Sequence, residues 1–361
     1  MQALSATAPP ATVTATRSGW IVSPAFDLAL FLLSSLVTLI PWLAVDRFRV
    51  HPFYVLAGVA IASNGPHLIS TWTRVYFDGR ERFARPLHYW LVPALISLAV
   101  LGFILVDGRD TVWLRTILFY WASWHFAAQC WGLLRIYQRK HGVHEQPVAL
   151  LEKALLFTGA GWCVLHRIFT GPWNLFGVPI WHPSPPAWVV NGVGAAAATL
   201  ALSYLFGRLA DWIRHGVVPD LRRLLMIAST VGAFAVPFLL IKDGTAAFAA
   251  AAAWHGFQYL GIVYFYNRNR YRGGLDRSAT VVSWLSQPRR GALYFAFLLA
   301  VAGVVYGGLA GLARLTRGTS WDEGTWGLFI WTSLTFSHYY LDGVIWKLRR
   351  DRTLTERLEA V

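Results

Sequence analysis

Long stretches of about twenty residues with almost no charged side chains recur along the whole chain, and they limit the folds open to it. One such stretch, as a helix, crosses the apolar core of a bilayer, which is about 30 Å thick. Charged residues make up only 14% of the sequence, whereas soluble domains carry about 25%. A β-barrel would instead show alternating segments of about ten residues. We therefore predict an all-α, polytopic transmembrane helix bundle.

The apolar stretches predict ten membrane spans within one domain. We expect residues 1–24 to form a disordered N-terminal tail, which lacks the pattern of a signal peptide. Residues 25–346 are expected to form a single transmembrane helical domain, and residues 347–361 a basic cytoplasmic C-terminal tail. The predicted spans are 25–45, 53–74, 86–106, 112–135, 149–168, 187–207, 221–241, 245–267, 291–313 and 324–346.

The distribution of Lys and Arg predicts the orientation of these spans. The two tails and every second connection, each counted with the adjoining span ends, hold 24 of the 32 Lys and Arg residues. The other connections, counted in the same way, hold the remaining 8. Cationic connections stay on the cytoplasmic side. Both termini are therefore expected in the cytoplasm. The protein itself is expected in a membrane of the bacterial inner (plasma) membrane type. The same anchoring accounts for the net charge of +14, so we expect no binding of nucleic acid.

Four histidines lie singly in the middle of four apolar stretches. They are His67, His125, His255 and His338, in the second, fourth, eighth and tenth spans. Ionisable side chains at membrane depth are costly and usually have a partner and a function. All four spans run in the same direction, and at about 1.5 Å per residue the four positions agree in depth to about 6 Å. Matched depth predicts one shared site in the bundle core, although it does not fix where the helices lie laterally.

Polar residues accompany each histidine at helical spacing. Asn64 precedes His67 by three residues and Thr71 follows it by four, while Gln129 follows His125 by four. Gln258 and Tyr259 follow His255 by three and four, and Asp342 follows His338 by four. Residues at this spacing share a helix face. Such groups can orient a metal-bound imidazole or serve as ligands themselves.

Neutral imidazoles favour iron, copper or zinc, and carboxylate or amide oxygens can complete the coordination. We predict that the four histidines bind iron or copper and that Asp342, Tyr259 and Tyr339 act in catalysis. Gln129, Gln258, Asn64 and Thr71 are predicted to line the cofactor site. The predicted function is an oxygenase-like membrane oxidoreductase whose partners are the lipid bilayer and a lipid-soluble substrate.

Three other functions remain open at this point. Paired histidines can ligate a b-type haem, which would indicate electron transfer. Buried histidines with Asp342 and Arg135 can relay protons in a transporter, although no matching inverted repeat is found. A structural subunit with an incidental polar core is the third. The sequence indicates neither the substrate nor the oligomeric state.

Overall fold

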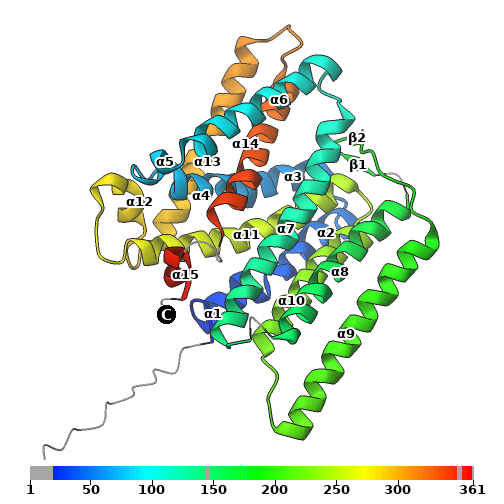
Figure 1. Cartoon of the computed structure of the whole chain (residues 1–361). Coiled ribbons are helices and arrows are strands. Elements are labelled where there is room, and N and C mark those ends of the chain that lie inside the picture. Colours follow the sequence, from blue (N-terminus) through cyan, green and yellow to red (C-terminus); the bar gives the residue numbers. More distant parts are fainter. Residues whose placement is uncertain (1–18, 144–145, 172, 348–351, 360–361) are drawn as a thin grey trace, which may run out of the picture.

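The computed structural model describes residues 19–143, 146–171, 173–347 and 352–359, and most of this part of the chain is helical. Figure 1 shows a bundle of helices with a small hairpin of two strands at one side. The hairpin pairs β1 (Asn174–Leu175) with β2 (Val178–Pro179) in antiparallel register. The all-α, membrane-like class predicted from the sequence is confirmed.

Helices of eight or more residues form most of the bundle. They are α3 (Pro52–Val59), α4 (Gly65–Val75), α6 (Val92–Asp107), α7 (Val112–Lys140), α8 (Pro147–Phe169), α9 (Ala187–His215), α10 (Leu221–Ala235), α11 (Gly244–Arg270), α13 (Gly291–Leu315), α14 (Glu323–Ile345) and α15 (Arg352–Glu359). The short α-helices are α1 (Pro24–Asp27), α2 (Leu39–Trp42), α5 (Glu81–Ala84) and α12 (Thr280–Leu285). Several π-helical and 3₁₀ segments join them, including η4 (Ala60–Asn64) and η5 (Leu87–Leu91).

Helical segments cover all ten ranges predicted as spans. In the described part of the chain, five helices are long and apolar enough to cross a membrane, or six if the bent pair Pro24–Leu32 and Ser34–Arg47 is one span. The four ranges outside this set are those that carry the histidines. Their polar side chains lower the mean hydropathy but are buried against protein, which hydropathy does not register.

The centre of the bundle is α11, which is buried over most of its length. It lies against α2, α3 and α4 as well as α7 and α10 (Figure 1). The run of small residues from 246 to 253 allows this close approach of neighbouring helices. By contrast, α6, α9 and α13 are mostly exposed along their apolar stretches, as helices that face lipid would be.

A buried ionic network joins four helices beside this centre. Glu152 of α8 is fully buried and forms an ion pair with Arg223 of α10. The Tyr204 hydroxyl of α9 donates a hydrogen bond of 2.9 Å to Glu152, and Nε2 of Gln138 in α7 donates one of 2.7 Å. A buried carboxylate is tolerated only when it is paired and hydrogen-bonded in this way. The network therefore fixes α7, α8, α9 and α10 relative to one another.

Most of the predicted N-terminal tail, residues 1–24, lies outside the described residues. Residues 19–23 are part of the packed structure, because the backbone amides of Ile21 and Val22 donate to the Asp27 carboxylate at 2.6 and 2.9 Å. Tyr137 of α7 donates to the same carboxylate at 2.8 Å. This contact attaches the start of the first helical segment to α7.

The predicted C-terminal tail, residues 347–361, contains the amphipathic helix α15. Its Leu354 and Leu358 are buried, and the helix packs against α11 and α7. Nδ2 of Asn269 donates a hydrogen bond of 2.6 Å to the carbonyl of Arg357, which attaches α15 to the C-terminal end of α11. This end of the bundle is therefore covered by a helix.

Candidate metal centre

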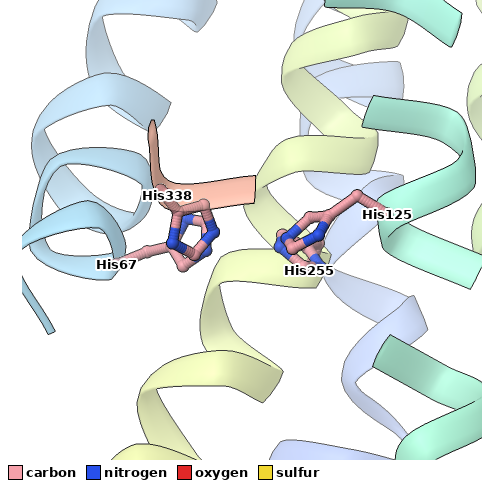
Figure 2. A group of neighbouring side chains, drawn as sticks. All are labelled: His67, His125, His255 and His338. Carbon is pink, nitrogen blue, oxygen red and sulfur yellow. The ribbon is translucent and has the colours of Figure 1, made fainter. Parts of the chain in front are cut away.

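The four histidines of the predicted spans meet at one place in the bundle core. His67 comes from α4, His125 from α7, His255 from α11 and His338 from α14, and all four are buried. One ligand nitrogen from each lies within 4.8 Å of those of the other three. Figure 2 shows the imidazoles of His67 and His338 facing those of His125 and His255.

The imidazole rings contact one another edge to face. The ring centroids of His67 and His338 are 4.3 Å apart, and those of His125 and His255 are 4.7 Å apart. Across the group, the centroids of His67 and His255 are separated by 4.7 Å and those of His125 and His338 by 5.0 Å. The four rings therefore form a closed group rather than a row.

The hydrogen bonding of the rings leaves nitrogen atoms free at this centre. Among the described residues, no hydrogen-bond partner is present for Nε2 of His67, His125, His255 or His338. A buried polar atom without a partner costs about 1–3 kcal/mol. A metal bound tetrahedrally at about 2.0–2.1 Å from each nitrogen would hold the four nitrogens about 3.3–3.4 Å apart. The nitrogens lie within 4.8 Å of one another, so the donor set fits one metal ion after the rings move inward by about 1 Å or less.

Local backbone features place His67 in this group. Pro66 is the second residue of α4, and the preceding segment η4 is π-helical. Proline removes a helical hydrogen bond, and π-helical turns often occur at functional sites. A Cβ atom on Gly256 would lie only 2.3 Å from Oγ of Ser63. Glycine at position 256, next to His255, therefore lets α11 approach η4 closely, directly before α4.

A hydrogen-bonded chain supports one side of the centre. The Thr71 hydroxyl lies 2.7 Å from Nδ1 of His338 and 2.9 Å from the Tyr259 hydroxyl. Tyr259 donates a hydrogen bond of 2.5 Å to Oδ1 of Asp342. The other oxygen of Asp342 lies 3.7 Å from Nε2 of both His125 and His338. The chain therefore begins and ends at the histidine group, and a bond at Nδ1 directs Nε2 of His338 inward.

The remaining predicted site residues differ in how close they lie to the imidazoles. Oδ1 of Asn64 lies 3.4 Å from Nδ1 of His67, and the ring of Tyr339 packs on His125 at a centroid distance of 4.3 Å. Gln129 donates to the backbone carbonyl of His255 at 3.2 Å rather than to an imidazole.

The hydrogen bonds of Gln258 lead away from the centre. Its Nε2 donates to the Phe31 carbonyl at 2.9 Å, and its Oε1 accepts from Gln129 and Cys130, both at 3.3 Å. These bonds occupy both ends of the side-chain amide. In this structure Gln258 therefore connects helices, and the amide does not contact a histidine.

Three aromatic or cationic residues near the centre were not among the predicted site residues. Phe126 stacks on His255 at a centroid distance of 4.4 Å, and Nε1 of Trp346 donates to Tyr259 at 3.3 Å. The guanidinium of Arg74 is buried over the rings of Trp346 and Tyr266, at 4.2 and 3.7 Å. Trp346 follows Asp342 by four residues, so helical spacing would have indicated it. Phe126 has no such signal, because its neighbour is on another helix.

A cavity of about 540 Å³ reaches the histidine group from the side of α7 and α14. His125, Tyr259 and Asp342 line it at the histidine group, and Lys347 and Leu358 line it near α15. Most of the wall between is aromatic or aliphatic, with Trp121 and Tyr339 close to the centre. Of the four histidines, His125 lines this cavity, so a molecule held in it would reach the group at His125.

Comparisons of the chain with protein-family models, with curated proteins and with solved structures give no match. The assignment of the site therefore depends on its geometry. A buried group of four histidines in an apolar helical bundle is compatible with a metal site in a membrane protein.

Proposed function

We propose that the chain is an integral membrane, metal-dependent oxidoreductase of the oxygenase type that acts on a lipid-soluble substrate. One observation carries the proposal: four histidine nitrogens converge within 4.8 Å beside an apolar cavity. Catalytic metal sites keep a position open for substrate, whereas structural sites are closed. The cavity next to His125 and Asp342 supplies such an approach.

The donor set favours iron or copper over the alternatives. Four neutral imidazoles and one nearby carboxylate are poor ligands for magnesium or calcium, which prefer several oxygens. A haem would require a flat slot between two axial histidines. The contacts among all four rings, with centroids 4.3–5.0 Å apart, leave little room for such a slot. Zinc fits the geometry but supplies no redox chemistry.

An iron or copper ion, when bound, would supply one-electron chemistry toward dioxygen. The overall reaction that we propose converts a substrate C–H bond, dioxygen, two electrons and two protons into C–OH and water. The electrons come from an external one-electron reductant such as a reduced iron–sulfur protein. In this scheme Asp342 carries a proton at Oδ2, beside His125 and His338, and Tyr259 orients the carboxyl group through Oδ1. The apolar wall of the cavity excludes water.

The membrane arrangement is part of the same proposal. We infer that the chain crosses a bacterial inner membrane ten times, with both termini in the cytoplasm. Helices over all ten predicted ranges and the alternating cationic connections support this topology. In that orientation the end of the cavity at Lys347 faces the cytoplasmic interface.

Elemental analysis of the purified protein tests the proposal. Wild-type protein should contain about one iron or copper ion per chain and consume dioxygen with a lipid extract and a reductant. His338→Ala should lose both properties. His166→Ala is the matched control, because His166 lies on α8 outside the group and should leave both unchanged. A protein that contains only zinc, or an active His338→Ala variant, would contradict the proposal.

A further inference from the structure

The cavity beside the histidine group is lined along its length by one face of α7 and the end of α14. On α7 the lining runs from Trp121 to Ile136, and on α14 from Tyr339 to Val344, with Trp346 and Lys347 just past the end of that helix. The two helical intervals correspond to about 22 and 8 Å at about 1.5 Å per residue. The space is therefore elongated along the helices and suits a chain-like molecule better than a compact one.

The polar groups of the cavity are separated by charge. Among the described residues that line it, Asp342 is the one carboxylate, and it lies at the histidine group. Lys347 lies at the other end and is exposed. His88 and Tyr340, whose Nδ1 and hydroxyl oxygen are 2.5 Å apart, lie on the lining as well. An anionic group is attracted to the ammonium of Lys347. Among the described residues that line the cavity, no lysine or arginine lies at the end beside the histidines.

We propose that the cavity binds a single-chain amphiphile with an anionic headgroup, a carboxylate or a phosphate. The headgroup lies at Lys347 and the apolar chain extends toward the histidines. This inference rests on the proposed function, since it names the substrate class of that site. His338 lies seven residues, or about 10 Å, from the end of α14 at Ile345, and Lys347 follows that end by two residues. The reacting part of the chain therefore lies on the order of 10 Å from the headgroup.

Two glycines give a way to block the cavity without disturbing the helices. Gly132 of α7 and Gly343 of α14 both line it, and a Cβ atom at either position would meet open space. Replacement of Gly132 by leucine should therefore project a side chain into the cavity. Because leucine also favours helix over glycine, this variant should fold.

Equilibrium binding of radiolabelled oleate, monooleyl phosphate and oleyl alcohol to the metal-free protein tests the inference. The two anionic ligands should bind at least about tenfold more tightly than the alcohol, as an added charge-assisted contact predicts. Whichever of them binds more tightly identifies the headgroup. Equal binding of the alcohol would overturn the proposal.

Charge-reversal variants locate the headgroup. Lys347→Glu should weaken oleate binding by about tenfold or more and leave oleyl alcohol unchanged. Arg268→Glu is the matched control, because Arg268 is exposed at the end of α11 and does not line the cavity. Gly132→Leu should prevent binding of all three ligands. Equal losses in both charge variants, or normal binding by Gly132→Leu, would place the ligand elsewhere and refute the proposal.

The measurement separates this inference from the proposed function. Binding of the three ligands is measured without metal, so it does not depend on whether the histidines bind iron or copper. Conversely, if the protein binds metal but binds neither oleate nor monooleyl phosphate, the proposed metal site stands. The inference of an anionic single-chain substrate is then refuted.

Discussion

The hydroxyl of Thr71 lies 2.7 Å from Nδ1 of His338, and the two residues are 267 positions apart in the chain. This contact fixes the ring so that Nε2 turns toward the other histidines. Thr71→Val keeps the shape of the side chain and removes the hydrogen bond. We expect metal affinity to fall about 10–100-fold, as is typical when the partner of a ligand is lost. Metal titration of the purified variant measures the change.

Thr73→Val provides the control for that experiment. Thr73 is also buried on α4, but its hydroxyl bonds to Tyr294 at 2.9 Å and to the carbonyl of Ser70 at 2.7 Å, away from the histidines. Thr73→Val should therefore lower the stability of the protein without changing its affinity for metal. If both threonine variants lose metal equally, the hydrogen bond to His338 has no special role.

The Asp342 carboxylate is the acidic group closest to the histidine nitrogens among the described residues, at 3.7 Å from two of them. Asp342→Asn keeps the volume of the side chain but cannot carry the proton. Under the proposed function, turnover should fall about 10²–10⁴-fold. Metal content should change far less. The check is the rate of dioxygen consumption normalised to bound metal, and a fully active variant would remove Asp342 from the mechanism.

The prediction from sequence was most informative about helices and least about contacts between them. Depth along each helix follows from residue number, so the level shared by His67 and His338 could be calculated. That Phe126 stacks on His255, or that Gln258 turns to Phe31, depends on lateral packing that spacing within one helix does not encode. The polarity of the histidine-bearing helices is also satisfied only in the folded bundle.

The ion pair of Glu152 with Arg223 should be a main determinant of stability. Glu152→Ala leaves the buried guanidinium without its partner, and the loss should be about 3–5 kcal/mol. Thermal unfolding in detergent measures the effect. Replacing the exposed Asp110 by alanine is a suitable comparison, because its side chain is 75% exposed and a surface change has little effect.

Asp322 should make stability depend on pH at the start of α14. The backbone amide and hydroxyl of Thr325 bond to its carboxylate and hold its pKa below the ordinary value of 3.8. The resulting stabilisation is present above that value and is lost as the pH falls through the lowered pKa. Asp322→Ala should cost about 1 kcal/mol at neutral pH, as the loss of a helix cap does. Unfolding curves of both proteins should converge at acid pH; a constant difference would contradict this.

X-ray absorption of the metal-loaded protein tests the central claim most directly. The account predicts an iron or copper ion with four histidine nitrogens at about 2.0–2.1 Å. It also predicts that this signal disappears in each of four variants, in which His67, His125, His255 or His338 is replaced by alanine. A protein that binds no metal, or a spectrum unchanged by His125→Ala, would contradict it.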